Sequence, residues 1–317
     1  MTYRLSEKRT EMKHCTEHFL KICEIFSFPP EAADTLCRTA QRIDAEPDFC
    51  DRFETITDGY MRQGTCALPA ALGKLWQLAD EKGVHRYTAN MVFIMHCSEF
   101  LLQNYLAAGY EETLFWLTMA DLRYKLLECM TCKHVVGTFV PEWYDGFLKS
   151  KRFALGRFQY EESAFPMDYV TAHGYALKKG DKCFSFHIPS SGVPLTDEIR
   201  LDSYRKAYAF YRDRGELTEG KLVLLCSSWL LYPKHAEFLP ESLNIRRFMN
   251  DFEIFKAEPS ETFRDSWRVF GDASELPPEQ WPEDTSLRKA YKQWILAGNP
   301  AGGGHGVIVF DGQKMIH

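Results

Sequence analysis

Two apolar segments in the second half of the chain decide the fold: Lys182-Cys-Phe-Ser-Phe-His-Ile188 and Leu222-Val-Leu-Leu-Cys-Ser-Ser-Trp-Leu-Leu231. Both have the length and apolar content of strands, and the nearly continuous run of the second is typical of a strand covered on both faces. Between them, Thr196 is placed to cap a helix that runs to about Arg212. Such a crossover makes the two strands parallel neighbours in one sheet, with a right-handed connection.

The same pattern analysis extends in both directions from this strand-helix-strand unit. Upstream, residues 153–160 and 174–178 read as strands, and a short glycine turn at 179–181 leads into the strand at 182–188. Downstream, we expect a short helix at 234–239, strands at 245–255 and 263–270, a helix at 286–297 and a last strand at 306–311. The core order is therefore β-β-β-α-β-α-β-β.

The first third of the chain shows a different pattern, in which apolar residues recur at three- and four-residue steps. Pro29-Pro30 ends the first helix, and Gly83 and Gly109 stand at later breaks, where helices usually stop. The expected helices cover residues 19–26, 31–42, 48–61, 68–82, 86–107 and 111–133. We therefore predict an α+β protein, with an all-helical N-terminal domain over residues 1–117 and a mixed β-sheet domain with flanking helices over residues 118–317.

Four short motifs in the second half resemble one known family. They are Leu155-Gly-Arg-Phe-Gln-Tyr160, His187-Ile-Pro189 with Leu195-Thr196, Ser228-Trp-Leu-Leu231 with Pro233, and Asn244-Ile245 with Arg247-Phe248. In this order they resemble the bacterial acyltransferase-domain proteins that join a helical N-acyltransferase N-terminal domain to a GNAT-like C-terminal domain. The resemblance covers most of the chain. It implies a GNAT-like (N-acyltransferase) sheet and transfer of an acyl group to an amine, with acetyl-CoA or another acyl-CoA as co-substrate.

The loop after the strand at 182–188 corresponds to the loop with which GNAT enzymes bind the CoA pyrophosphate. Such loops present free backbone N–H groups at a helix N-terminus. Here the loop, Ser190-Ser-Gly-Val-Pro-Leu195, departs from that pattern, because it contains one glycine and Pro194 lacks an N–H, while Asp197 and Glu198 add negative charge to the first helical turn. The residues predicted to bind the cofactor are Ile188, Ser190, Ser191, Gly192, Ser228 and Trp229.

Acyl transfer from a thioester requires a base for the amine, a donor for the oxyanion and an acid for the thiolate. The predicted catalytic residues are His187, Tyr232 and Ser227, which close the two parallel strands. His187 suits the base, or is a structural histidine that bonds the adjacent loop. Ser227 lines the cleft or satisfies a strand bulge, and Tyr232 is the acid or an ordinary surface tyrosine. Glu161 and Glu162 form a further base candidate, or a solvated strand end.

Two further motifs suggest a functional site without the context to support it. Cys129-Met-Thr-Cys132 has the spacing of a zinc ligand pair, but the sequence contains no second pair at a suitable separation. Two cysteines on one face of a helix usually pack in the apolar core. Gly302-Gly-Gly-His-Gly306 suggests a phosphate loop, yet a helix precedes it and a strand follows, so we expect a flexible connection. The sequence therefore predicts no metal site.

Composition indicates a folded protein with two cores. Its 317 residues exceed the usual size of one domain, and 45% of them are hydrophobic. The 38 Lys and Arg against 44 Asp and Glu give a net charge of -6, so the sequence lacks the excess of basic residues that is typical of proteins that bind nucleic acid or an anionic membrane. With no signal-peptide pattern and no membrane-length apolar segment, we expect a cytoplasmic protein whose ten cysteines stay reduced.

These observations together predict an acyl-CoA-dependent N-acyltransferase that acts on a small amine or a peptide. The irregular loop at 190–195 favours an alternative, in which a GNAT fold has lost catalysis and binds a ligand or a partner. The polar residues His187 and Ser227 at the strand ends favour the enzyme. The acyl donor, the amine acceptor and the oligomeric state are left open by the sequence.

Overall fold

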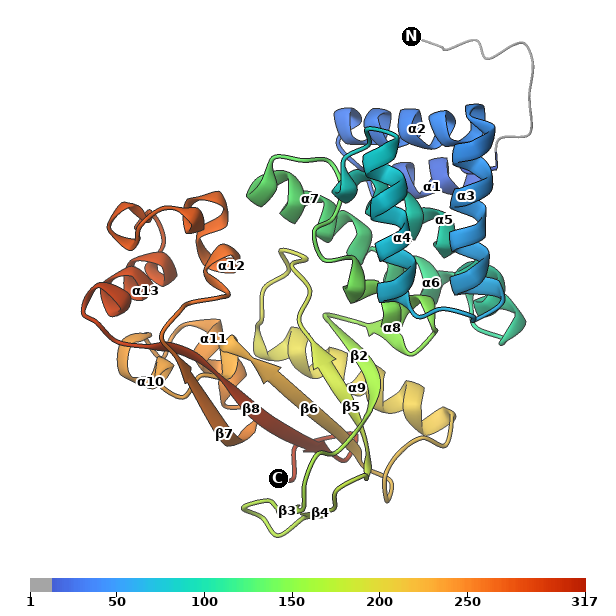
Figure 1. The fold of residues 1–317 in the computed structure, drawn as a ribbon. Helices are drawn as coiled ribbons and strands as arrows, with labels where there is room; N and C mark the ends of the chain where they lie inside the picture. Colours follow the sequence, from blue (N-terminus) through green and yellow to red (C-terminus); the bar gives the residue numbers. More distant parts are fainter. Residues whose placement is uncertain (1–12) are drawn as a thin grey trace. The chain divides into compact units, whose positions relative to one another are not determined.

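The chain folds into two compact units, residues 1–150 and residues 151–317 (Figure 1). A computed structural model describes residues 13–317. The first unit is helical and the second contains a mixed β-sheet with helices around it. The predicted α+β fold class is therefore confirmed.

The helical unit follows the predicted helices closely. Its elements are α1 (Glu17–Ile25), α2 (Pro30–Ala45), α3 (Pro47–Thr57), the π-helical turn η1 (Asp58–Arg62), α4 (Leu68–Glu81), α5 (Arg86–Ala107), α6 (Glu112–Met119), α7 (Asp121–Lys133), the 3-10 turn η2 (Pro141–Tyr144) and α8 (Asp145–Leu148). Proline occupies the first turn of α2, α3 and α4, where its missing N–H costs no hydrogen bond. The predicted helix at 86–107 is found with the same bounds.

The long helix α5 lies at the centre of this unit and contacts α1, α2, α4, α6 and α8. Every residue from Thr88 to Ser98 is buried, so the helix has no polar face over three turns. A helix buried all round is the expected core element of a helical unit of this size. Its polar side chains must therefore find partners inside the protein.

The boundary between the units lies at residues 150 and 151, not at 117 and 118 as the sequence predicted. A boundary after Leu117 would cut α6, whose Phe115 is fully buried against Tyr105 of α5 at 5.8 Å between ring centroids. The predicted helix at 111–133 is in fact two helices, α6 and α7, with Ala120 between them. Both belong to the helical unit, which therefore extends to Ser150.

The second unit contains a six-stranded sheet and a separate two-stranded ribbon. The six strands are β1 (Arg152–Leu155), β2 (Phe158–Ala164), β5 (Lys182–His187), β6 (Leu222–Ser228), β7 (Glu253–Ser260) and β8 (Ala301–Phe310), in the spatial order β1-β2-β5-β6-β8-β7. The strands β3 (Tyr169–Val170) and β4 (Ala176–Leu177) form the ribbon. The predicted strand at 153–160 is a hairpin, because Gly156 turns the chain between β1 and β2 with a φ of +80°.

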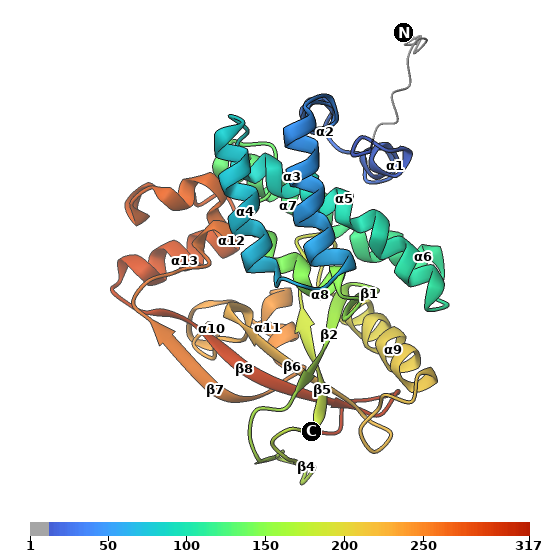
Figure 2. The ribbon, with the colours of Figure 1, turned by 45° about the vertical axis from the view of Figure 1, so that its right-hand side comes forward.

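Strands β5 and β6 are parallel, as predicted, and every other pairing in the sheet is antiparallel. Helix α9 (Asp197–Asp213) forms the crossover and packs on one face of the sheet (Figures 1 and 2). On that face the ring of Phe184 stacks on that of Tyr211 of α9, and the ring centroids of Phe186 and Tyr204 are 6.0 Å apart. Alternation along β5 therefore points its phenylalanines toward α9 and leaves Ser185 and His187 on the opposite face.

The remaining helices of this unit surround the ends of β6, β7 and β8 (Figure 2). They are the turn η3 (Trp229–Leu231), α10 (His235–Phe238), α11 (Asn244–Met249), α12 (Ser266–Phe270), the turns η4 (Gly271–Glu275) and η5 (Pro278–Gln280), and α13 (Ser286–Leu296). Leu239, Val269, Phe270, Trp281 and Tyr291 form a core of their own among these helices. This aromatic cluster fixes the long connection between β7 and β8.

Three strand assignments from the sequence were wrong in type or in bounds. Residues 244–249 form α11 before β7 begins at Glu253, and the predicted strand at 263–270 contains α12. The glycine run at 302–306 is not a flexible connection, because it lies inside β8. A Cβ at Gly302 would meet the ring of Tyr232 at 2.5 Å, and one at Gly304 would meet the carbonyl oxygen of Leu231 at 2.2 Å. Glycine is required here because η3 packs directly on the strand.

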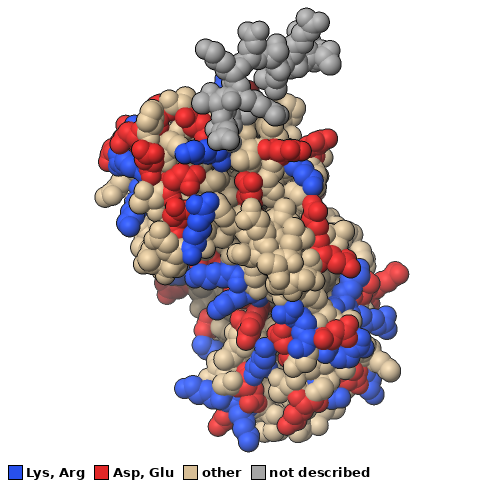
Figure 3. Space-filling view, turned by 90° about the vertical axis from the view of Figure 1, so that its right-hand side faces the viewer, with Lys and Arg blue, Asp and Glu red and all other residues tan. Residues whose placement is uncertain are grey.

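Among residues 13–317, no helix combines the length and the apolar content needed to span a bilayer. On the face drawn in Figure 3, acidic and basic side chains are interspersed over both units, and neither sign forms a continuous patch. This mixture matches the near balance of 38 basic and 44 acidic residues. The face therefore carries no extended field of one sign.

Candidate active site

The parallel strands β5 and β6 separate toward their carboxyl ends. Their ladder pairs Phe184 with Leu224 and Ser185 with Leu225, and it ends there. Beyond that point β5 continues to His187 in its pairing with β2, and β6 continues to Ser228 in its pairing with β8. Figures 1 and 2 show the two arrows diverging at these ends. The backbone of both strands is thus free of mutual pairing where the predicted cofactor would enter.

Polar side chains collect on one face of the sheet at this separation. Ser185 and Leu225 are in register, so His187 and Ser227, two residues further along each strand, share the same face. Ser227 is in turn directly opposite His305 of β8. Toward the amino ends of β5 and β6 the same face is apolar and contains the buried residues Cys183, Val223 and Val307. On β5, β6 and β8 the residues His187, Ser227 and His305 therefore lie together near the carboxyl ends of β5 and β6.

A cavity of about 500 Å³ opens over β6, β7 and β8. Its lining consists of residues 227–229, 258–260, 262–265 and 302–305. Three residues that the sequence analysis selected, Ser227, Ser228 and Trp229, are thus brought together in one cavity. Of the three glycines at 302–304, Gly303 lies on the same face of β8 as His305, whereas Gly302 and Gly304 face Tyr232 and Leu231. Ser228 also accepts a hydrogen bond from the N–H of Leu230 at 3.2 Å, which starts the turn η3.

His305 and Glu258 are the site residues that sequence reasoning missed. His305 Nε2 lies 3.1 Å from Glu258 Oε2, and both residues line the cavity. The side chain of His305 is 25% exposed, so it is accessible to a ligand. Hydrogen bonds from Lys256 and His305 lower the pKa of Glu258, which keeps its carboxylate ionised. A histidine oriented by a carboxylate in a polar cavity is the usual form of a general base.

His187, the base predicted from the sequence, lies on β5 beside a different carboxylate. Its Nε2 is 3.2 Å from Glu161 Oε2, and Arg152 holds the same carboxylate oxygen through Nε at 2.9 Å. Burial raises the pKa of Glu161, but His187 and Arg152 outweigh burial and lower it to about 2. A carboxylate with so low a pKa is a weak base. This geometry removes support for Glu161 as the base and leaves His187 as a partly exposed histidine beside it.

Tyr232 is placed away from the cavity lining, with 3% of its surface exposed. Its ring packs against Gly302 of β8, whereas His187 contacts Glu161 of β2. Burial raises the pKa of Tyr232, so its hydroxyl donates a proton less readily than that of an exposed tyrosine. The predicted acid is therefore part of the packing behind the cavity floor.

The loop from Ser190 to Leu195 is held by two arginines. Arg157 donates to the carbonyl oxygens of Pro189 at 2.9 Å and Val193 at 2.8 Å, and Arg200 donates to that of Leu195 at 2.6 Å. Gly192 turns the loop with a φ of +75°. Among the described residues, the N–H groups of Gly192 and Leu195 have no hydrogen-bond partner.

Arg200 also offsets the negative charge that the sequence places at the start of α9. Its guanidinium lies 3.0 Å from Asp197 and forms a bidentate pair with Asp251 at 2.5 and 2.9 Å. Arg200 is buried, so this charge is held in place beneath the loop. The loop therefore combines a helix N-terminus with two N–H groups that have no partner among the described residues, which are features of anion-binding loops.

Comparisons with known proteins agree with this architecture. Residues 18–149 match the family described as the N-acyltransferase N-terminal domain, and residues 153–308 match the GNAT-like C-terminal domain. The chain belongs to the proteins that join these two domains. The predicted family is thus confirmed, and the GNAT-like domain is the sheet unit that carries the cavity. A search of curated proteins finds no match to this chain.

Solved structures of acyltransferases share the fold over nearly the whole chain. An acyltransferase mutant in complex with octanoyl-CoA is 18% identical, with a TM-score of 0.72 over 93% of this chain and 88% of that one. An acyltransferase in complex with decanoyl-CoA and teicoplanin is also 18% identical, with a TM-score of 0.71 over 92% and 87%. At this identity the likeness concerns the fold of the GNAT-like protein and not its substrate.

Proposed function

We propose that the protein transfers an acyl group from acyl-CoA to a primary amine bound in the cavity of the GNAT-like domain. The observation that carries the proposal is the separation of β5 and β6 beyond Ser185 and Leu225, next to a polar cavity lined by Ser227. Family membership supports it, as do the acyl-CoA complexes of acyltransferases with the same fold. The acceptor is a small amine or a peptide, and teicoplanin in one of those complexes is a glycopeptide precedent.

The CoA pyrophosphate is assigned to the loop after β5. Its binding groups are the N–H groups of Gly192 and Leu195 and the N-terminus of α9, with Ser190 and Ser191 beside them. Arg200 holds the loop from behind through the carbonyl oxygen of Leu195, and its own charge is paired with Asp251. The thioester then extends between the separated ends of β5 and β6, past Ile188 and toward Ser228 and Trp229. This arrangement retains all six cofactor-binding residues predicted from the sequence.

The proposed reaction forms one C–N bond and breaks one C–S bond. The amine nitrogen attacks the thioester carbonyl, the CoA thiolate leaves, and the proton lost by the amine balances the proton gained by the thiolate. We assign the base to His305, because it lines the cavity with Ser227 beside it, whereas His187 lies on β5. Ser227 is assigned to hydrogen-bond the reacting groups. His187 remains the sequence-based candidate for the base, to be compared with His305, and Tyr232 remains the sequence-based candidate for the acid.

The cellular setting proposed for this activity is the cytoplasm. All ten cysteines are free thiols, and six of them are buried: Cys15, Cys50, Cys97, Cys129, Cys183 and Cys226. A chain with this many unpaired cysteines suits a reducing compartment.

A thermal-shift series with CoA and acyl-CoAs of increasing chain length tests the proposal. A ligand that binds only the folded state at 100 times its Kd stabilises the protein by about 2.7 kcal/mol. We expect stabilisation by acyl-CoA that Gly192→Asp weakens, because the new carboxylate repels the pyrophosphate. Gly174→Asp is the matched control, since Gly174 also has a positive φ, of +84°, and open space around its Cα.

Turnover is then measured as CoA thiol release with a panel of amines. Stabilisation by acyl-CoA together with amine-dependent release supports the enzyme. No stabilisation by CoA or any acyl-CoA would favour the alternative, a non-catalytic GNAT-like protein that binds another ligand or a partner.

A further inference from the structure

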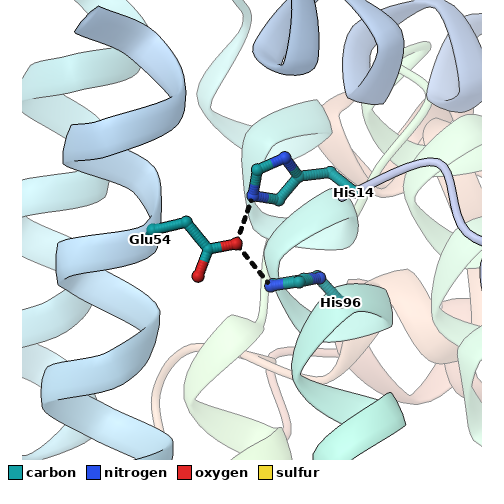
Figure 4. A group of neighbouring side chains, drawn as sticks. All are labelled: His14, Glu54 and His96. Carbon is teal, nitrogen blue, oxygen red and sulfur yellow. Dashed lines mark ion pairs between the residues drawn. The ribbon is translucent and has the colours of Figure 1, made fainter. Parts of the chain in front are cut away.

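Three potential metal ligands converge inside the helical unit, from segments far apart in the sequence (Figure 4). His14 precedes α1, Glu54 lies on α3 and His96 lies on α5. Glu54 Oε1 is 2.9 Å from His14 Nε2 and 3.5 Å from His96 Nε2. In Figure 4 both imidazole rings direct a nitrogen at the same carboxylate oxygen. One ligand atom from each residue lies within 4.8 Å of the other two.

In the described part of the chain, three of the four ring nitrogens of these two buried histidines lack the hydrogen-bond partner that buried polar groups normally have. His14 is 0% exposed and His96 is 5% exposed. Among the described residues, neither ring nitrogen of His96 has a hydrogen-bond partner, and the contact of His14 Nε2 with Glu54 lacks hydrogen-bond geometry. By contrast, the buried Asn90 on the same helix α5 accepts from Trp76 and donates to the carbonyl of Thr138. Leaving such groups unpaired is costly, so the cluster lacks a component.

The other nitrogen of His14 shows which component fits. His14 Nδ1 is 2.6 Å from Asp44 Oδ1, and Asp44 also accepts the backbone N–H groups of His14 at 3.1 Å and Cys15 at 3.3 Å. With its proton on Nδ1, the ring presents the lone pair of Nε2 to the carboxylate of Glu54. A lone pair and a carboxylate oxygen repel each other unless a cation lies between them. A carboxylate behind a histidine is also the usual support of a metal-bound imidazole.

We propose that His14 Nε2, His96 Nε2 and a carboxylate oxygen of Glu54 bind one divalent transition-metal ion, with Zn²⁺ the expected metal. Two imidazoles and one carboxylate are a common zinc donor set, with a fourth position for water. Ligands at about 2.0–2.1 Å from a tetrahedral ion are about 3.3 Å from one another. The observed separations of 2.9 and 3.5 Å lie on either side of that value. Glu54 is 23% exposed, which leaves an entry path for the ion.

A protonated His14 between two carboxylates is the main competing explanation. That arrangement pairs the charge of His14 with Asp44 on one side and Glu54 on the other. It leaves both nitrogens of His96 without partners in the described part of the chain, whereas a metal ion uses one of them. The proposed ion would join the segment before α1 to α3 and α5, so its role is structural. It replaces the sequence-based expectation of no metal and does not involve the Cys129 and Cys132 pair.

The test is metal analysis of the full chain, purified without a histidine tag, dialysed against Zn²⁺ and then against metal-free buffer. We expect one equivalent of zinc per chain, and a loss of at least ten-fold in occupancy for His96→Gln and Glu54→Gln. His134→Asn is the control: it removes an exposed histidine with a φ of +53°, a conformation that asparagine tolerates. Zinc-free wild-type protein, or full occupancy in His96→Gln, would overturn the proposal.

A second measurement uses the unmodified protein, because a variant of a buried residue can lose its fold. X-ray absorption of the zinc-loaded chain reports the ligands directly. Two imidazoles with nitrogen or oxygen in the remaining positions are expected. A spectrum with sulfur ligands, or with no imidazole, would place the ion elsewhere and refute the assignment. Neither measurement depends on acyl transfer, so the metal site and the proposed function stand or fall separately.

Discussion

Replacing His305 by glutamine tests the proposed base, because glutamine retains polarity and approximate size but does not accept the proton of the amine. A positioned general base contributes about 10²- to 10⁴-fold in rate, or roughly 3–5 kcal/mol of the barrier. His305 is 25% exposed on β8, and its neighbours Gly304 and Gly306 make the packing contacts with Leu231. We therefore expect His305→Gln to lower kcat by about two to four orders of magnitude while the fold is retained.

The contribution of Glu258 to this base should be much smaller. Its carboxylate lies 3.1 Å from His305 Nε2, but the Glu258 side chain is 52% exposed and also pairs with Lys256. Exposed ion pairs change an equilibrium by less than about fivefold, and salt weakens them further. Glu258→Gln should therefore lower kcat by less than about fivefold, and the difference from wild type should shrink in high salt.

The assay is amine-dependent release of CoA thiol, with the best acceptor from the amine panel. His187→Gln is the matched variant, since it makes the same substitution on the same face of the sheet, on β5 in place of β8. We expect His305→Gln to lose the most activity of the three. An unchanged kcat in His305→Gln, or a greater loss in His187→Gln, would refute the assignment of the base.

Two further predictions concern packing and pH. Gly304→Ala should destabilise the GNAT-like domain by about 1–3 kcal/mol in urea unfolding, because the new Cβ would lie 2.2 Å from the carbonyl oxygen of Leu231. Gly303→Ala is the control and should destabilise the domain less, since its nearest contact would be at 3.3 Å. Equal losses of unfolding free energy in the two variants would contradict this account of β8. Glu161 has a pKa lowered to about 2 from 4.5. Its stabilisation is therefore complete above about pH 4.5 and is lost as the pH falls toward 2. Unfolding free energy measured from pH 5 to 2 should fall less steeply in Glu161→Gln than in wild type, and parallel curves would show that Glu161 does not couple to folding.

The parallel pair and its crossover helix could be predicted from the sequence, because each element has a local pattern. The apolar run at 222–228 and the helical spacing from Asp197 onward need no knowledge of the rest of the fold. The segments at 245–255 and 263–270 predict strands because they contain several aromatic and branched residues, whereas residues 244–249 and 266–270 are helical. Their helical form depends on packing in the aromatic cluster around Tyr291 and Trp281, which no local pattern shows.

The candidate site was predicted only in part. The sequence pattern identifies Ser227, Ser228 and Trp229, because hydroxyl groups that interrupt an apolar strand need hydrogen-bond partners or line a site. His305 was missed because the glycines around it have low strand propensity and the fit of η3 against them is a tertiary effect. A signal did exist: His305, Val307 and Val309 follow one another at steps of two, which places the histidine on the buried face of a strand.

The central claim is that acyl-CoA binds where β5 and β6 separate, and calorimetric titration of the full chain with acyl-CoA tests it most directly. Saturable binding of one acyl-CoA per chain is predicted, with a Kd within the usual micromolar to millimolar range of enzyme substrates. Gly192→Asp should weaken that binding at least tenfold, and Gly174→Asp should leave it unchanged. The absence of heat with every acyl-CoA up to millimolar concentration, or equal binding by Gly192→Asp and wild type, would contradict the account.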